Sequence, residues 1–507
     1  MLSKITSFAL KGLEGYPLCI EVDIHNGMPT YDIVGLADTA IKESRERVRS
    51  AIKNSGFSYP VACIVVNLAP ADTKKEGSFY DLPIALATLI ASDQTRQTEQ
   101  MNNYVILGEL SLNGEVRKIS GLLPMLIAAR EQGYVNAIIP EENLTEASFV
   151  DGMNLLPVSN LRQVVEYFEG KTQVEPIKCQ KWSANTITND DVDMKYIHGQ
   201  FIAKRAMEIA VAGGHNILMI GPPGAGKTML ARAVPTIMPD LTFEEALEIA
   251  KIHSIAGVLD GFVHERPFRS PHHTASTVAL TGGGTKVKPG EISLAHNGVL
   301  FMDELPEYSR YTLETLRQPL EDGVITVSRS AGTVCYPSNF MLIASMNPCP
   351  CGHYGSQVHE CSCSPAQIHR YLSKLSGPLL DRIDMHVEVD AVSYQDLQSE
   401  ALAEDSQTVK QRVNNARSLQ NARFEGTSVH CNAKMTAPLI KRYCKLDADS
   451  SKLLENAFER LNISARAYNR VLKVARTIAD LEGSEAILTK HLAEALQYRS
   501  LDKKFLV

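Results

Sequence analysis

The sequence predicts a multidomain α/β protein with an α+β domain over residues 1–170, a second α/β domain over 191–395 and a helical domain over 396–507. Three observations lead to this fold class. Strand-like and helix-like runs alternate in the first domain, an apolar run enters a glycine-rich loop at 216–231 in the second, and the third has helical periodicity. Residues 171–190 are polar and aperiodic, which indicates a linker.

Length and composition narrow the class of protein. At 507 residues the chain is too long for one hydrophobic core, and its formal net charge is −7. This charge argues against a protein that coats nucleic acid over its whole surface. Basic residues outnumber acidic ones after residue 405, where they form either solvated helix faces or a phosphate-facing surface. No run approaches the roughly 18 apolar residues of a membrane span and the first residues lack a signal-peptide core, so we expect a cytoplasmic protein without membrane contact.

Residues 1–170 show two kinds of periodicity. Short apolar runs typical of strands lie at Leu18–Ile24, Ala62–Leu68, Tyr104–Leu107 and Ala137–Ile139. Patterns typical of helices lie at Ala40–Asn54, Leu82–Ala91 and Leu122–Gln132. The alternation indicates a separate domain with its own core.

The second domain is organised around the stretch NILMIGPPGAGKTMLA at residues 216–231. A short apolar strand, Ile217–Ile220, leads into a loop of the form GxxxxGKT and then into a helix, which is the context of a phosphate-binding P-loop. The glycines let backbone amides approach phosphate oxygens, Lys227 reaches the β- and γ-phosphates, and Thr228 offers its hydroxyl to Mg²⁺. The predicted nucleotide-binding residues are Gly221, Pro222, Pro223, Gly224, Ala225, Gly226, Lys227 and Thr228.

A second apolar strand, beginning at Gly298, ends in the two carboxylates Asp303 and Glu304. This is the Walker B pattern. We expect Asp303 to hold the water shell of Mg²⁺ and Glu304 to polarise the water that attacks ATP, because both tasks need a carboxylate at the C-terminal edge of the sheet. A third strand, Phe340–Ser345, is followed by Asn347.

Neighbouring segments resemble parts of AAA+ ATPases. Asn347 matches the polar sensor that this class places beside the γ-phosphate, and Ile197 with Gly199 resembles the segment that lies against adenine. A hairpin over 324–336 resembles the one that projects into the pore of ring helicases. Arg329, near its tip, is either a phosphate contact or an exposed turn arginine. The glycine-lysine loop at 282–288 is a candidate for a mobile DNA contact.

Two arginines resemble catalytic arginines of the same class. Arg382 resembles the arginine finger that a neighbouring subunit inserts into the ATP site, with an ion pair to Asp381 or Asp384 as the alternative. Arg466 matches the sensor arginine of the helical lid, and the resemblance implies that it acts at the ATP site of its own chain. Helices of the lid are expected at Val409–Ala422, Ser451–Leu461 and Ala465–Leu481. The resemblance implies ATP and Mg²⁺ as cofactors and assigns catalytic roles to Lys227, Asp303, Glu304, Asn347, Arg382 and Arg466.

Four cysteines form two close pairs, Cys349 with Cys351 and Cys361 with Cys363. Four thiolates in this pattern can surround one Zn²⁺ tetrahedrally, and soft sulfur ligands select zinc over Mg²⁺. Pairs of the form C-x-C are less usual than C-x-x-C, so two alternatives stay open. A histidine, His353 or His359, could replace one thiol, or the four cysteines could be reduced and metal-free.

The first domain resembles the catalytic domain of Lon-type proteases along Gly108–Asn143. These proteases activate a serine nucleophile with a lysine, because a hydroxyl at its free pKa is a poor nucleophile. Leu123 occupies the position of the lysine, and Phe79 that of the serine, with Ser78 one residue early. A one-residue slip could restore the serine but not the base. We therefore expect a Lon-like fold that is inactive as a protease and that scaffolds subunits or contacts DNA.

The ordered motifs resemble the AAA+ branch that contains magnesium chelatase ATPase subunits and MCM helicases. The Lon-like front, the cysteine pairs and the segment SARAYNRVLKVARTIADLE narrow the resemblance to the YifB/ComM family of magnesium-chelatase-like ATPases, over nearly the whole chain. Membership implies a homohexameric ring, an ATP-driven motor that migrates branched DNA while incoming single strands integrate during natural transformation. The implied partners are single-stranded or branched DNA and recombination proteins. The alternative is a magnesium-chelatase-like ATPase that drives metal insertion or remodels a protein partner.

Overall fold

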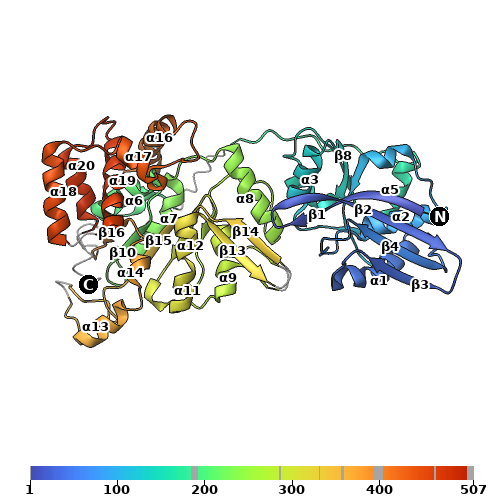
Figure 1. Cartoon of the computed structure of the whole chain (residues 1–507), viewed down its shortest axis with the longest axis horizontal. Helices are drawn as coiled ribbons and strands as arrows, with labels where there is room; N and C mark the ends of the chain where they lie inside the picture. Colours follow the sequence, from blue (N-terminus) through green and yellow to red (C-terminus); the bar gives the residue numbers. More distant parts are fainter. Residues whose placement is uncertain are drawn as a thin grey trace.

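The structure is a computed structural model that describes residues 2–183, 192–284, 287–329, 332–355, 359–391, 404–461 and 464–499. Three domains lie in chain order along the long axis of the molecule, with the N-terminal domain at one end and the helical domain at the other (Figure 1). Within those ranges, no helix combines the length and the hydropathy that a membrane span requires.

The N-terminal domain begins with a four-stranded sheet and two helices: β1 Leu2–Lys11, β2 Glu14–His25, β3 Thr30–Val34, α1 Thr39–Asn54, β4 Cys63–Ala69 and α2 Asp81–Ala91. The strand order is β1-β2-β4-β3. β2 pairs antiparallel with β1 and β4, and the edge strand β3 pairs parallel with β4. Apolar side chains of the sheet, α1 and α2 share one hydrophobic cluster, so this half of the domain has a core of its own.

A three-stranded parallel sheet in the order β5-β8-β9 completes this domain. Its elements are β5 Tyr104–Ile106, β6 Glu109–Leu110, β7 Val116–Arg117, α3 Leu122–Glu131, β8 Asn136–Pro140, α4 Leu144–Ala147, β9 Asn154–Val158 and α5 Leu161–Phe168. All the strands and helices expected from the sequence in residues 1–170 are present. The strands β1, β3, β6, β7 and β9 are additional findings.

The P-loop domain is a five-stranded parallel sheet in the order β11-β12-β15-β10-β16. The strands are β10 Ile217–Ile220, β11 Phe268–Arg269, β12 Val299–Met302, β15 Met341–Met346 and β16 Met385–Glu388. Every residue of β10, β12 and β15 is buried, as expected for a parallel sheet with both faces covered. The α/β architecture expected from the sequence is confirmed.

Helices surround this sheet, and a two-stranded hairpin projects beside it (Figure 1). The helices are α6 Phe201–Gly213, α7 Lys227–Ile237, α8 Phe243–Ala256, α9 Thr277–Thr281, α10 Glu291–Leu294, α11 Arg310–Thr315, α12 Arg317–Asp322, α13 Pro365–Leu372 and α14 Gly377–Leu380. The hairpin pairs β13 Val324–Arg329 with β14 Gly332–Pro337 in antiparallel register.

The helical domain consists of α16 Ser406–Arg423, α17 Ala437–Tyr443, α18 Ala448–Leu461, α19 Ala465–Leu481 and α20 Thr489–Gln497. Its apolar side chains share one hydrophobic cluster with α6, α7 and the adjacent face of the sheet. Inside the domain, Arg423 donates to both carboxylate oxygens of Asp480, which is buried. The domain is therefore fixed on the α6 side of the P-loop domain by apolar contacts.

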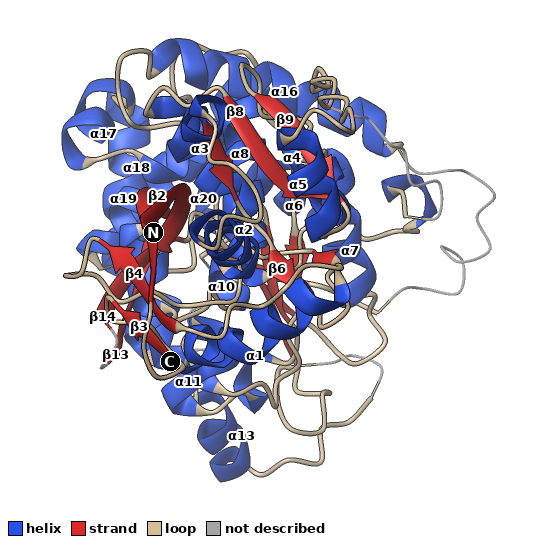
Figure 2. Ribbon diagram, turned by 90° about the vertical axis from the view of Figure 1, so that its right-hand side faces the viewer, coloured by secondary structure: helices blue, strands red, loops and turns tan. Residues whose placement is uncertain are grey.

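The N-terminal domain is also fixed to the P-loop domain. Apolar side chains of α3 and α8 form one cluster, and the amide of Gly121 donates to the carbonyl of Ser254 at 2.9 Å. The turn between β1 and β2 reaches the hairpin, where a Cβ on Gly12 would lie 3.0 Å from a methyl of Val334. Figures 1 and 2 both show α3 beside α8. Trp182, within the expected linker, donates to the carbonyl of Val263 at 3.0 Å.

The residues at the Lon-type catalytic positions lie in ordinary structural settings. Leu123 is buried in α3, and Phe79 packs against the ring of Tyr80 at 4.4 Å between centroids. The Ser78 hydroxyl donates to Glu109. Lys75 is buried and its ammonium group donates to the carbonyl of Pro70. Nothing in these contacts joins a serine to a lysine base.

Candidate functional site

Three adjacent parallel strands deliver the predicted nucleotide residues to one edge of the sheet. β10, β15 and β12 run parallel to one another, and each is followed directly by a loop that carries predicted site residues. The P-loop follows β10, Asp303 follows β12 and Asn347 follows β15. Because the carboxyl ends of parallel strands meet at one edge, the sequence motifs converge there although they are far apart in the chain.

The P-loop lysine is held by oxygen atoms of its own loop. The ammonium of Lys227 donates to the carbonyls of Gly221 and Pro222 at 2.7 and 2.9 Å, and to Oδ1 of Asn347 at 3.1 Å. Burial lowers the pKa of Lys227 to about 8, although Asp303 and Glu304 oppose the shift. The lysine is therefore held between its own loop and the end of β15.

The predicted Mg²⁺ ligands contact each other. The Thr228 hydroxyl donates to Oδ2 of Asp303 at 2.9 Å. The buried Ser345, on β15, donates to the other carboxylate oxygen of Asp303. Asp303 is thereby oriented from two sides. Ser345 was not predicted as a site residue. The one sequence feature that could have indicated it is its position two residues before Asn347, on the strand that lies beside β12.

The second carboxylate has an unusual backbone. Glu304 has φ of +52°, in the left-handed region that a residue other than glycine rarely adopts, and its side chain is exposed. Its Oε2 atom lies 3.7 Å from Nδ1 of His273, whose ring centroid lies 4.1 Å from that of His272, with the two ring planes tilted by 34°. The two histidines thus belong to a loop beside the Walker B carboxylate, and no contact of His273 with Glu304 was predicted from the sequence.

The segment predicted to contact adenine lies beside the P-loop. Ile197 is buried, Gly199 has φ of +62°, and the Gln200 side chain donates to the carbonyl of Ala225 at 3.2 Å. Gln200 also donates to the carbonyl of Asp390 at 2.5 Å, beyond the end of β16. The segment is therefore anchored at the nucleotide edge, while adenine contact itself stays a prediction.

Arg382 lies at the opposite edge of the sheet. Its backbone carbonyl accepts a hydrogen bond from Asn216, the residue before β10. A four-residue parallel strand is about 13 Å long, so the sheet itself separates Arg382 from the P-loop that follows β10. The guanidinium group pairs with Glu321 on α12, not with Asp381 or Asp384. The alternative of an intrasubunit ion pair thus has a partner that sequence reasoning did not name.

The hydrogen bond from Arg382 lowers the pKa of Glu321, and the charges of Arg466 and Arg470 add to this effect. Arg466 is exposed at the start of α19. Arg382 is thus bonded to this carboxylate and Arg466 contributes only its charge, and both lie on the side of the sheet away from the P-loop of their own chain. The Arg382 Nε atom is buried and has no hydrogen-bond partner among the described residues.

Asp384 anchors the helical domain at this same edge. Its carboxylate accepts from the amide of Asn216 at 3.0 Å and pairs with Arg470 of α19 at 3.1 Å. Although burial opposes ionisation, His215, Arg470 and the Asn216 amide hold the pKa of Asp384 below its usual value. A cavity of about 260 Å³ lies here, lined by basic side chains that include Arg382, Arg470 and Lys473.

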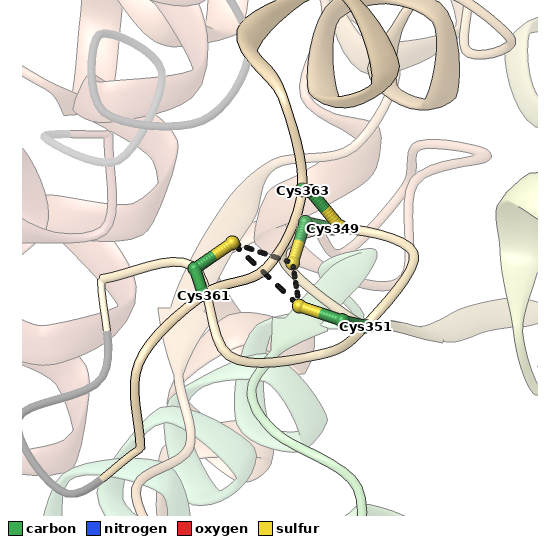
Figure 3. A group of neighbouring side chains, drawn as sticks. All are labelled: Cys349, Cys351, Cys361 and Cys363. Atoms are coloured by element: carbon green, nitrogen blue, oxygen red, sulfur yellow. Dashed lines mark hydrogen bonds between the residues drawn. The ribbon is translucent and has the colours of Figure 1, made fainter.

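The four predicted zinc ligands come together (Figure 3). The sulfur atoms of Cys349, Cys351 and Cys361 lie 3.3 to 3.7 Å apart, and all four lie within 4.8 Å of one another. Tetrahedral Zn²⁺ with Zn–S bonds of about 2.3 Å would place sulfur atoms about 3.8 Å apart. A hydrogen bond from the His353 amide is the main cause that lowers the pKa of Cys351 to about 5. The donor set therefore fits one metal ion.

The predicted DNA-contacting residues lie partly outside the described residues. The β13–β14 hairpin is present, but the side chain of Arg329 belongs to the part that is not described. In the glycine-lysine loop, Gly283 pairs with Lys288, and residues 285 and 286 are likewise outside the description.

Comparisons with known proteins agree with this arrangement. The family model "Magnesium chelatase, subunit ChlI" matches residues 193–397, "Subunit ChlI of Mg-chelatase" matches 20–143, and "Magnesium chelatase, subunit ChlI C-terminal" matches 403–499. The chain is 44% identical to the YifB protein of Escherichia coli over 505 residues, covering 99% of the chain and 98% of YifB. Competence protein ComM of Haemophilus influenzae is 44% identical over 506 residues, with the same coverage of both chains.

The chain belongs to the YifB/ComM family of magnesium-chelatase-like ATPases. This confirms the resemblance predicted from the ordered motifs. The YifB/ComM chain also matches the Lon protease of Buchnera aphidicola at 28% identity over 177 residues, which covers 32% of this chain and 22% of the protease. The Lon-like character of its fold therefore has support that is independent of the chelatase matches.

Proposed function

We propose that this YifB/ComM family member is an ATP-driven, hexameric DNA motor that promotes branch migration during recombination in natural transformation. The observation that carries the proposal is the division of its charged residues between two edges of one sheet. Lys227 and Asp303 lie at one edge, and Arg382 lies at the other. An arginine that stabilises the transferring phosphoryl group must then come from a neighbouring subunit, and a closed ring satisfies this need at every site.

The chemistry assigned to each residue follows from its place. Lys227 binds the β- and γ-phosphates, Thr228 and Asp303 hold Mg²⁺, and Glu304 orients the attacking water. Mg²⁺ supplies charge neutralisation on the phosphate oxygens. Asn347, already bonded to Lys227, senses the γ-phosphate. The neighbouring subunit supplies Arg382. Arg466 was expected to act in its own chain, but its charge acts on Glu321, the partner of Arg382, so we propose that it too acts across the subunit interface.

Two features favour DNA as the substrate of the motor. The β13–β14 hairpin extends from the P-loop domain as an arm of twelve strand-paired residues, Val324–Arg329 and Gly332–Pro337, and resembles pore hairpins of ring helicases. The relative ComM is a competence protein. DNA uptake and recombination are processes in which such a motor would act on single-stranded or branched DNA.

Hydrolysis measured with and without single-stranded or forked DNA tests this function. We expect DNA to stimulate hydrolysis, and we expect DNA affinity to fall as salt rises, because phosphate contacts release counterions. A Lys227→Ala variant should retain DNA binding and lose hydrolysis. An absence of both stimulation and binding at low salt would overturn the DNA assignment.

The chelatase-like alternative is favoured by one observation, the match of three chelatase family models to most of the chain. In that case the ring would drive metal insertion or remodel a protein partner. To act as such a chelatase, the ring would need a large porphyrin-binding protein as a partner. Hydrolysis that is stimulated by a protein fraction and not by any DNA would favour this second function.

We further propose that the four cysteines hold Zn²⁺. Their number, their soft donor atoms and their spacing suit one tetrahedral ion. His353 and His359 lie with their rings 4.9 Å apart, and the four thiols meet without either imidazole among them. Metal analysis of the purified protein should find about one zinc per chain. A zinc-free protein would favour four reduced cysteines.

A further inference from the structure

The segment that carries the first cysteine pair touches the P-loop on both sides of the pair. Before Cys349, Asn347 accepts a hydrogen bond from Lys227 at 3.1 Å. After Cys351, the buried Gly352 lies so close to the P-loop that a Cβ on it would be 2.5 Å from Cδ of Pro223. Two metal ligands are thus placed between two contacts with the nucleotide-binding loop.

The backbone of Gly352 favours glycine, and its turn also presents the first cysteine pair. Its φ of +84° is in the left-handed region that favours glycine. Its amide donates to the carbonyl of Cys349 at 3.0 Å, and the amide of Tyr354 donates to Cys349 Sγ at 3.3 Å. The turn that presents the first two thiols is therefore the same turn that packs on Pro223.

The second cysteine pair leads back to the same strand end. Cys363 is followed directly by α13, whose N-cap Ser364 forms a capping box with Gln367. Tyr371, near the end of α13, is buried, and its hydroxyl interacts with the backbone of Asn347. A metal bound to both pairs would therefore close a ring of chain that starts and ends at Asn347.

We propose that metal in the cysteine site fixes Asn347 and the P-loop in position, so that metal occupancy strengthens ATP binding. The proposal rests on the nucleotide and zinc sites of the proposed function. Metal–thiolate bonds would hold the two cysteine pairs together, and the contacts of Asn347 with Lys227 and of Gly352 with Pro223 would persist before nucleotide binds. Without metal, ordering of this loop becomes a cost of nucleotide binding. Because coupling between sites is reciprocal, bound nucleotide must also slow the loss of metal.

The first test removes Cys361, a predicted metal ligand that does not contact the P-loop. In Cys361→Ser we expect zinc content to fall, and we expect a fluorescent non-hydrolysable ATP analogue to bind at least about fivefold more weakly than to wild type. The matched control is Ser362→Ala, which lies between the two cysteines of the same pair and is exposed. This variant should keep both the metal and the affinity.

A second variant separates the contact from the metal. Gly352→Ala leaves all four thiols in place but adds a methyl group at Pro223 in a strained backbone. We expect near-normal zinc content together with analogue binding that is weaker by about the same factor as in Cys361→Ser. Circular dichroism of both full-length variants checks that they fold.

The third measurement uses the wild-type chain alone. Zinc transfer to a chromophoric chelator should slow by about fivefold or more when the non-hydrolysable analogue is saturating. The coupling would be overturned if zinc-free Cys361→Ser bound the analogue as tightly as wild type, or if saturating analogue did not change the rate of zinc transfer. Neither result would bear on the proposal of DNA-stimulated hydrolysis. A wild-type chain without zinc would overturn the coupling and the zinc assignment together, but not the ATPase.

Discussion

The two edges of the central sheet hold charge in different ways. At the C-terminal edge, Lys227 and Thr228 are bonded to the P-loop carbonyls and to Asp303, groups that bound phosphate and Mg²⁺ would replace. This edge has the cation, the carboxylates and the amide donors of an ATP site. Among the described residues, no arginine of the same chain is bonded to any of these groups.

At the N-terminal edge the arginines are already paired. Arg382 bonds to Glu321, and Arg470 bonds to the buried Asp384. The Arg382 pair is accessible from one side through Glu321, whose side chain is 53% exposed, whereas the Asp384 pair is enclosed between two domains. The Asp384 pair joins the helical domain to the sheet, whereas in the proposed ring the exposed Glu321 side of the other pair would be the side that faces a neighbouring subunit.

The largest effect is expected from removing Arg382, the proposed arginine finger. Arg382→Ala should reduce hydrolysis by about 10³- to 10⁵-fold, because the transferring phosphoryl group loses a fixed positive charge. Mixed with Lys227→Ala, it should recover about a quarter of wild-type hydrolysis, because random rings rebuild a complete site at one junction in about four. Steady-state hydrolysis of the mixtures measures this.

The control is Glu321→Ala, which removes the intrasubunit partner of Arg382 and should leave hydrolysis within severalfold of wild type. Mixtures of Arg382→Ala and Lys227→Ala that stay inactive, in rings shown to exchange subunits, would contradict action across the subunit interface. Loss of activity in Glu321→Ala would instead assign a structural role to the pair.

Removal of the enclosed carboxylate should affect stability and not nucleotide binding. Asp384→Ala leaves Arg470 buried without its counter-ion, a change that costs about 3–5 kcal/mol. Urea denaturation of the full chain should show the loss, while analogue affinity stays near that of wild type. Asp381→Ala, in the same segment but without a described ion pair, is the matched control and should have little effect on stability.

A Ser345 variant shows how strongly neighbouring side chains of the same chain hold Asp303 in position at the nucleotide edge. Ser345→Ala removes a donor that orients Asp303, so the Mg²⁺ concentration needed for half-maximal hydrolysis should rise about 10- to 100-fold. Titration of hydrolysis with Mg²⁺ at saturating ATP measures the effect. Ser338→Ala lies before the same strand at the opposite edge and should leave the Mg²⁺ requirement unchanged. Equal requirements in both variants would contradict the role given to Ser345.

The smallest expected effect is a pH dependence of ATP affinity. Burial lowers the pKa of Lys227 to about 8 in the free chain, and bound phosphates would raise it again. ATP then binds best to the protonated lysine. The affinity for ATP is therefore highest below pH 8 and falls by up to about tenfold per pH unit above it. Analogue titrations from pH 7 to 9.5 measure this. Lys227→Met should bind weakly and show no such slope; a persistent slope would assign the titration to another group.

Sequence periodicity predicted the buried elements well and the edge strands poorly. The strand Ile217–Ile220 and the helix Ala465–Leu481 have the predicted bounds, because each has an uninterrupted apolar run or a clear apolar face. The edge strand Thr30–Val34 was not predicted. Its residues are alternately exposed and only partly buried, so it carries little hydrophobic signal, and pairing with β4 alone makes it a strand.

The sequence by itself determined which chemical groups this protein has and the local structure that presents them. The P-loop, the Walker B carboxylates and the two cysteine pairs are each contiguous, so their spacing is fixed by a few backbone dihedrals. Tertiary structure alone decided the partners of those groups. Ser345 with Asp303 and Gly352 with Pro223 are distant in sequence and meet because strands of one parallel sheet end side by side, whereas Glu321 reaches Arg382 from helix α12. Which strands become neighbours depends on packing of the whole core, and no local pattern records it.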